Sequence, residues 1–182
     1  YQIYKSVQEN YSRTLEALWN QLPDYTQGKN ARVVADVSGA MSGDPMSVSV
    51  SLALYFAERN KGQFKDHFIT FSGNPRLQRV VGQSLRDRMN SIENAEWQGN
   101  TNLQAVFDLI LNTALQNSTS IDEMPETIYI ISDMEFDSAC DTRTNFEVIK
   151  EKYKQANYKI PNLVFWNVDA RSGNNLPVQK DE

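Results

Sequence analysis

The chain has 182 residues, 40% of them hydrophobic and 10% aromatic, which suits one domain with a substantial core and leaves little room for two. Its formal net charge of −5 argues against a generally basic surface for nucleic acids, and no apolar run approaches the ~18 residues that a membrane span needs. Cys140 is the only cysteine, which excludes a disulfide within the chain and favours a reducing, cytoplasmic location.

The beginning of the chain predicts a helix, a strand and a second helix. Apolar residues repeat at helical spacing over residues 4–22, which predicts an amphipathic helix that ends before Pro23 and covers a sheet face. A buried strand is expected over residues 31–36. The next helix is expected over residues 45–60, because proline is well suited to the first turn of a helix.

The middle of the chain continues this alternation. A buried strand is expected over residues 67–71, and the mixture of charged and apolar side chains over residues 76–81 is typical of an edge strand. A short helix then carries Leu85, Met89 and Ile92. The most regular helical periodicity in the chain follows over residues 102–116.

The last predicted elements complete an alternating pattern of strands and helices. Residues 127–132 are apolar throughout, which predicts a central strand buried on both faces. A helix follows the capping-box spacing at Thr144, and the last strand is expected over residues 162–168. This order predicts a three-layer α/β/α, Rossmann-like fold, in which helices cover both faces of a mainly parallel sheet with one antiparallel edge strand.

The same pattern predicts how the chain is organised. Residues 1–30 are expected to form an N-terminal amphipathic helix and a connection that packs on the domain, residues 31–168 the domain itself, and residues 169–182 a polar tail. The first residue is Tyr1 rather than methionine, so we expect the chain to be part of a longer polypeptide.

Small oxygen-bearing side chains stand where two predicted strands end and where one predicted helix begins. Asp36 is the last residue of the first predicted strand, and Ser38 lies two residues after it. Thr101 precedes the long helix, and Asp133 follows the apolar strand. Loops that leave the carboxyl ends of parallel strands commonly build the ligand site of such a sheet. Hydroxyl and carboxylate oxygens suit Mg²⁺, Mn²⁺ or Ca²⁺, whereas zinc prefers histidine or cysteine.

Three motifs at these positions, DVSGAM at 36–41, GNTN at 99–102 and SDMEFD at 132–137, together resemble the von Willebrand factor A (vWA) domain. Members of that family form a metal-ion-dependent adhesion site (MIDAS) from a D-x-S-x-S loop, a threonine and an aspartate in this order. The resemblance covers residues 31–168. The finer pattern is similar to the A-like part of a DUF2828/TROVE-related family of unknown function, which includes relatives of the Ro-type RNA-binding autoantigen.

The resemblance implies a role for each residue of the site. Ser38 would bind the ion directly, Asp36 and Asp133 largely through water, and Thr101 in either way, while a carboxylate of a partner protein would complete the coordination. Ala40 stands where the family has its second serine, so we expect weakened binding of Mg²⁺ or a similar ion. The final strand and helix of the family are also expected to be missing after residue 168.

Three functions remain open on this basis. The first is a non-catalytic intracellular interaction module with a protein partner. The second is an RNA-associated domain, as in Ro-type proteins, which the net charge does not support. The third is a Mg²⁺-dependent phosphoryl-transfer enzyme or nuclease, although Asp-nucleophile phosphatases need an acid where Ser38 stands.

Purely structural roles, without any part in binding, also remain open for several of these residues. Thr101 and Gln104 have the spacing of a capping box, so the threonine could serve as a helix cap. Glu135 and Asp137 could be solvated loop acids, and residues 134 and 136 could be core anchors or an apolar rim.

Overall fold

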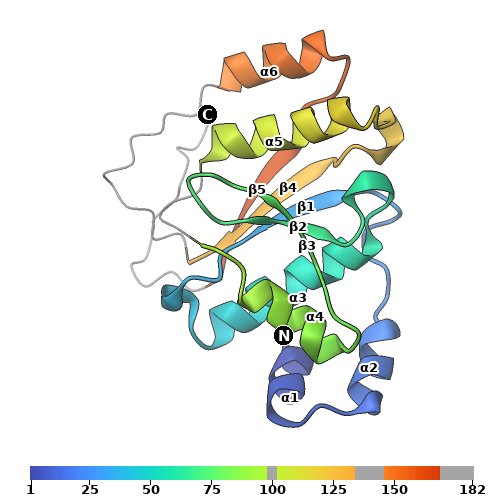
Figure 1. Cartoon of the computed structure of the whole chain (residues 1–182), viewed down its shortest axis with the longest axis vertical. Helices are drawn as coiled ribbons and strands as arrows, with labels where there is room; N and C mark the ends of the chain where they lie inside the picture. The colour runs from blue at the N-terminus through green and yellow to red at the C-terminus, as the bar shows by residue number, and fades with distance from the viewer. Residues whose placement is uncertain (98–101, 134–145, 169–182) are drawn as a thin grey trace.

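The computed structural model describes residues 1–97, 102–133 and 146–168. Within these residues, five strands form one sheet in the order β3-β2-β1-β4-β5. Figure 1 shows this sheet between layers of helices. The strands are β1 (Ala31–Ala35), β2 (His67–Thr70), β3 (Leu77–Arg79), β4 (Thr127–Ser132) and β5 (Asn162–Asn167).

The sheet is parallel except at one edge. β1 lies in the middle and pairs in parallel with β2 on one side and β4 on the other, while β5 extends the parallel sheet beyond β4. β3 pairs antiparallel with β2 at the opposite edge, as its mixed sequence predicts. All residues of β1 are buried. The strand predicted as central, β4, is interior, but β1 occupies the middle of the sheet.

Helices cover both faces of the sheet and divide the core in two. One face carries α3 (Asp44–Arg59) and α4 (Leu85–Glu93), and the other carries α5 (Leu103–Gln116) and α6 (Phe146–Gln155) (Figure 1). Successive side chains of β1 pack alternately into the core on one face of the sheet and the core on the other, because side chains alternate across a strand. Val33 and Ala35 belong to the α3 side, and Val34 to the α5 side. The three-layer α/β fold predicted from the sequence is therefore confirmed.

The N-terminal segment differs from its prediction. It forms two helices, α1 (Gln2–Asn10) and α2 (Arg13–Asn20), because Ser12 has an extended backbone and its hydroxyl accepts a hydrogen bond from the Leu15 N–H, which caps a new helix. α1 contacts α2, α3 and α4. The expectation that this segment covers the sheet directly is wrong, because α3 and α4 already occupy that face and the N-terminal helices form a further layer outside them (Figure 1).

The remaining helices begin where the sequence predicts. α3 starts one residue before Pro45, after Gly43 has turned the backbone with a φ of 93°. α4 begins with a capping box between Ser84 and Asp87. The capping box expected at Thr144 lies outside the described residues. Within the described ranges, no helix combines the length and hydrophobicity needed to cross a bilayer.

Candidate functional site

Asp36 stands at the carboxyl end of β1 in a fixed orientation. Its backbone N–H donates to the carbonyl of Ile131 at 3.1 Å, which continues the pairing of β1 with β4. One carboxylate oxygen accepts from the Ser38 N–H and the other from the Ser132 hydroxyl, both at 2.9 Å. The side chain is therefore held between the turn that follows β1 and the end of β4.

A second buried carboxylate follows β4. Asp133 is 4% exposed and Asp36 is 3% exposed. The two side chains come together because β1 and β4 are parallel neighbours whose carboxyl ends lie at the same edge of the sheet. This edge thus concentrates negative charge out of contact with water, which is costly unless a cation or a proton compensates it.

The pKa of Asp36 reflects this environment. Burial raises the pKa of its carboxyl group, and the negative charge of Asp133 raises it further, while the hydrogen bonds from Ser38 and Ser132 lower it. The net shift is upward. Protons therefore compete with a cation for this carboxylate, and a lower pH would oppose cation binding.

The turn after Asp36 positions Ser38. Ser38 is half-buried, and its carbonyl accepts from the Met41 N–H at 3.0 Å at the start of a 3₁₀ turn over Gly39–Met41. The Met41 side chain is 0% exposed and anchors this turn in the protein. The loop that carries the expected metal ligand is therefore attached to the core at both ends.

Ser42, two residues after Ala40, is the nearest following hydroxyl that could replace the missing serine. Ala40 is exposed. The Ser42 hydroxyl donates to the carbonyl of Gly39 at 2.8 Å, so it stabilises its own turn. The Ser42 hydroxyl is therefore engaged within its own turn, and the weakened binding expected from Ala40 stays a prediction.

Thr101 lies outside the described residues, but its neighbour Asn102 is described. Asn102 caps α5, because its side chain accepts from the Ala105 N–H at 3.1 Å. The helix therefore begins one residue later than a capping box at Thr101 predicts. The Asn102 N–H donates to the carbonyl of Ser72 at 3.3 Å, which places the start of α5 beside the carboxyl end of β2.

The sequence reasoning missed one residue of this site. Ser132, the last residue of β4, donates its hydroxyl to Asp36, a role that its place before Asp133 in the sequence does not indicate. Its signal in the sequence is a hydroxyl side chain at the end of an otherwise apolar strand. Residues 134–137 and Cys140 lie outside the described residues.

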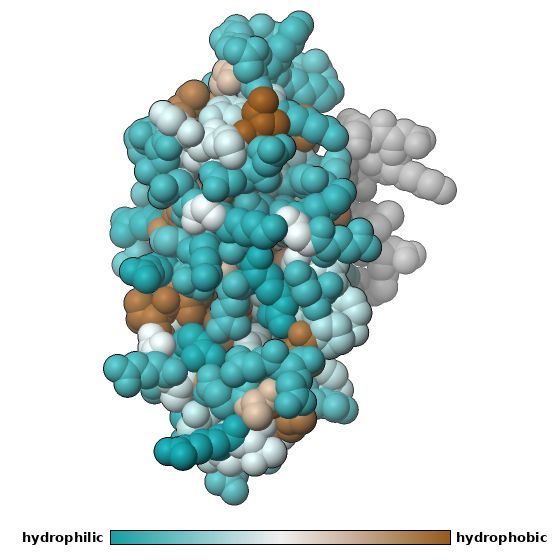
Figure 2. Space-filling model, turned by 90° about the vertical axis from the view of Figure 1, so that its right-hand side faces the viewer, coloured by the Kyte–Doolittle hydropathy of each residue, from teal (hydrophilic) through white to brown (hydrophobic). Residues whose placement is uncertain are grey.

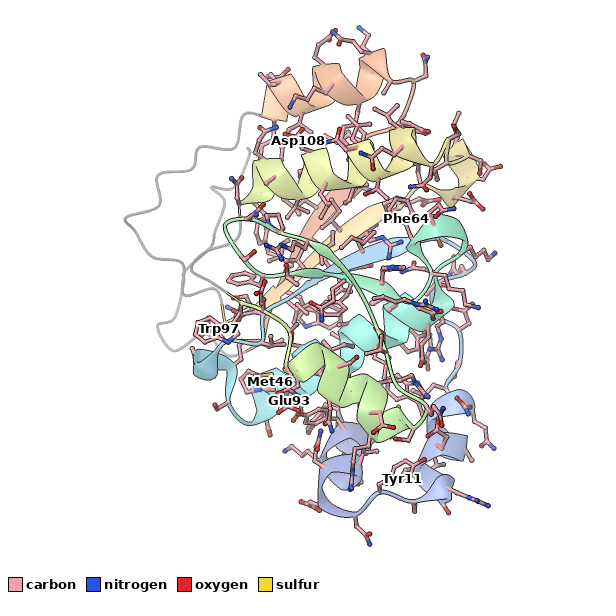
Figure 3. All side chains as sticks on the ribbon, viewed as in Figure 1. Tyr11, Met46, Phe64, Glu93, Trp97 and Asp108 are labelled. Carbon is pink, nitrogen blue, oxygen red and sulfur yellow. The ribbon has the colours of Figure 1, made fainter. Side chains whose placement is uncertain are left out.

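Figure 3 locates one aromatic residue near the same end of the sheet. Trp97 lies on the side of the turn that follows β1, whereas Phe64 lies at the opposite end of the sheet (Figure 3). The Trp97 side chain is 50% exposed. An exposed aromatic ring on this side is available for contact with a partner.

The donor atoms at this edge fit a hard cation. In the part of the chain that the structure describes, no group of three or more histidine, cysteine, aspartate or glutamate side chains is placed to hold a metal. The donors are instead two carboxylates with hydroxyls beside them, from Asp36, Asp133, Ser38 and Ser132. Such oxygen atoms suit Mg²⁺, Mn²⁺ or Ca²⁺.

Fold and site together define a three-layer α/β domain with a buried pair of carboxylates at the carboxyl edge of its sheet. Residues 30–182 match the family described as a domain of unknown function, DUF7788, and the chain belongs to this family. One similar protein is the "Uncharacterized protein L728" of Acanthamoeba polyphaga mimivirus, which is 31% identical over 180 residues. The match covers 95% of this chain but 31% of the viral protein, so the chain spans about a third of that relative.

Proposed function

We propose that this domain is a non-catalytic interaction module that binds a carboxylate of a partner protein through a MIDAS-type divalent cation, as vWA domains do. The observation that supports the proposal best is the buried pair of Asp36 and Asp133 at the ends of adjacent parallel strands. A cation beside them would offset the cost of two neighbouring buried negative charges.

Each residue of the proposed site would have a different role in holding the cation. Ser38 would contact the cation directly, and Asp36 and Asp133 would hold its water ligands, with Thr101 as a further hydroxyl ligand. Ser132 would keep Asp36 in position through its hydrogen bond. The cation would supply the positive charge that attracts an acidic group of the partner, and it would take no part in bond breaking.

Added cation should stabilise the native protein but not the Asp36→Asn variant. At a concentration of Mg²⁺ or Mn²⁺ about a hundredfold above Kd, the gain should be about 2.7 kcal/mol, because the ion binds only the folded state. The amide oxygen can still accept from the Ser38 N–H, and the amide NH₂ group can donate to the Ser132 hydroxyl in place of the bond that the carboxylate accepts, without the negative charge. Asp36→Asn should therefore melt at a higher temperature than the native protein when no cation is present. Thermal unfolding in a metal titration measures both effects.

The matched control is Asp122→Asn, which removes an exposed carboxylate in the turn Ile121–Glu123. It should respond to cations as the native protein does. No shift of the native protein with either ion would contradict the proposal, as would an equal response of Asp36→Asn. A Glu-containing peptide that binds in Mn²⁺, but neither in EDTA nor when its Glu is replaced by Gln, would support the partner chemistry.

Restoring the missing serine should strengthen the site. Ala40→Ser places a hydroxyl on an exposed position of the turn, where it has room, and should tighten Mn²⁺ binding by about tenfold because ligand number sets affinity in such sites. Titration calorimetry of both proteins measures this difference. Equal affinities would mean that position 40 does not face the ion.

A further inference from the structure

One large aromatic side chain is exposed on the side of the molecule that carries Asp36. Figure 2 shows the molecule from the right-hand side of Figure 1, away from the turn that follows β1, and this face is mainly hydrophilic with separate hydrophobic patches. Trp97 lies on the side of that turn, and its side chain is 50% exposed (Figure 3). Tryptophan is among the residues that most often contribute strongly to a protein interface. Trp97 is therefore a candidate contact for the partner of the proposed cation site.

A series of contacts links Trp97 to the sheet beside Asp36. Asp36 directly follows the β1 residue that is paired with Thr70 on β2. The Thr70 hydroxyl accepts from the Arg76 N–H at 2.9 Å, and the Thr70 N–H donates to the Arg76 carbonyl at 3.0 Å. The Arg76 guanidinium in turn lies 3.5 Å from the carboxylate of Glu96, the residue before Trp97. These contacts place Trp97 at the carboxyl edge of the sheet, on the β2 side of Asp36.

The spacing along this edge suits an extended protein segment. Neighbouring strands lie about 4.8 Å apart, so the backbone of Arg76, which lies beyond β2, is about 10 Å from that of Asp36. An extended chain advances about 3.3 Å per residue and directs alternate side chains to the same face. A carboxylate at the cation and a side chain two residues away would therefore both face the protein, and the second side chain would extend toward Trp97.

The groups around Trp97 favour an apolar side chain of the partner over a second acidic one. The Arg76 guanidinium already lies beside the Glu96 carboxylate, so a second acid of the partner would have to compete with Glu96 for it. The indole ring instead gains from contact with another apolar or aromatic side chain, which removes both surfaces from water. A contact outside the coordination sphere also matters more if Ala40 costs the cation a ligand, as the sequence predicts.

We propose that the partner of the cation site is an extended protein segment with an apolar side chain two residues from its coordinating carboxylate, and that this apolar side chain packs against Trp97. The inference rests on the proposed function, because the cation holds the carboxylate. Trp97 then selects among acidic segments and takes no part in binding the cation.

A pair of peptides that differ only beside the acid tests this preference. They are acetyl-Ser-Phe-Ser-Glu-Ser-Phe-Ser-amide and its counterpart with Ala in place of both Phe, so that either direction of binding is covered. In Mn²⁺, titration calorimetry should show the Phe peptide binding about tenfold more tightly to the native protein. Trp97→Ala should lower this ratio to about one, and Trp97→Phe should keep part of it. Neither variant should alter the thermal shift that Mn²⁺ alone produces.

Nuclear magnetic resonance in Mg²⁺ identifies the ring that the peptide contacts. The chain has three tryptophans, so each indole N–H signal can be assigned by substitution. The Phe peptide should shift the Trp97 signal in a saturable manner and more strongly than the signal of Trp166, which is 42% exposed on β5. The Ala peptide should shift the Trp97 signal less.

Tyr25→Ala is the matched control, because Tyr25 is an exposed aromatic residue in the connection that leads to the amino end of β1. It should keep the preference for the Phe peptide. Equal binding of both peptides in Mn²⁺, lost in EDTA, would overturn this inference and leave the proposed function standing. A preference that survives Trp97→Ala, or that is lost in Trp166→Ala instead, would have the same meaning. If neither peptide binds in a cation-dependent way, the proposed function is overturned and this inference with it.

Discussion

Trp19→Ala is expected to lower the free energy of unfolding by about 3–5 kcal/mol, the usual cost of truncating a large buried aromatic side chain. Trp19 is 3% exposed, and its indole N–H donates to Glu58 on α3. Such a loss would be a large part of the ~5–15 kcal/mol that stabilises an ordinary domain. Urea unfolding followed by circular dichroism measures it without relying on tryptophan fluorescence.

The adjacent Leu18→Ala is the control for this substitution. Leu18 lies on the same helix but is 48% exposed, so its truncation should cost about 0.5 kcal/mol or less. A large difference between the two variants would mean that α1 and α2 belong to the folding unit, although the family match begins at residue 30. Equal small losses would mean instead that these helices are held loosely.

An ion-pair network gives a further reason to expect a firmly held N-terminal layer. Arg88 on α4 lies 2.8 Å from Glu16 on α2 and 2.8 Å from Glu58 on α3, and all of these side chains are largely shielded from water. Glu16 also accepts from the Tyr11 hydroxyl at 2.9 Å. The network joins three helices through charges that would be poorly compensated if α2 moved away.

Periodicity predicted the elements of this fold better than their limits. The pattern over residues 102–116 identified α5 almost to the residue, because its apolar stripe is continuous. The same criterion merged α1 and α2, since their apolar residues remain in phase across the break. The local signal was Ser12, whose hydroxyl competes for backbone donors and begins a new helix.

The candidate site could be predicted only as far as topology decides it. Adjacent parallel strands bring their carboxyl ends together, so Asp36 and Asp133 were expected to lie near each other. The role of Ser132 depends on the register that pairs Ala35 with Ile131, and no sequence pattern specifies that register. The sequence likewise could not decide whether α5 is capped by Asn102 or begins one residue earlier at Thr101, since asparagine and threonine are both good caps.

Arg32 is the residue that the sequence reasoning could least anticipate. It begins an apolar run and would ordinarily extend its charge into water, yet it is 0% exposed. Its position follows from the alternation along β1, which directs Arg32 to the same face as Val34, toward the core under α5. Which face of the sheet α5 covers, and therefore whether the Arg32 side chain is buried, depends on the complete topology of the fold.

Arg32→Met is expected to raise the free energy of unfolding by about 1–3 kcal/mol, because replacing a poorly compensated buried charge with an apolar side chain of similar volume is commonly stabilising. One guanidinium nitrogen donates to the carbonyl of His67 at 3.1 Å, and the group lies 4.2 Å from the centroid of the Phe64 ring. Its Nε and second terminal nitrogen have no partner among the described residues. Urea unfolding of both proteins measures the gain.

The dependence on pH and a second substitution sharpen this prediction. Burial lowers the pKa of the Arg32 guanidinium, and a base whose pKa falls on folding destabilises the native state at every pH below that lowered value. The gain of Arg32→Met should therefore be constant between about pH 5 and 8, where arginine stays charged. Arg32→Lys keeps a charge but loses the planar contact with Phe64, so it should be less stable than the native protein. A Met variant that is also less stable would mean that the guanidinium is well compensated where it lies.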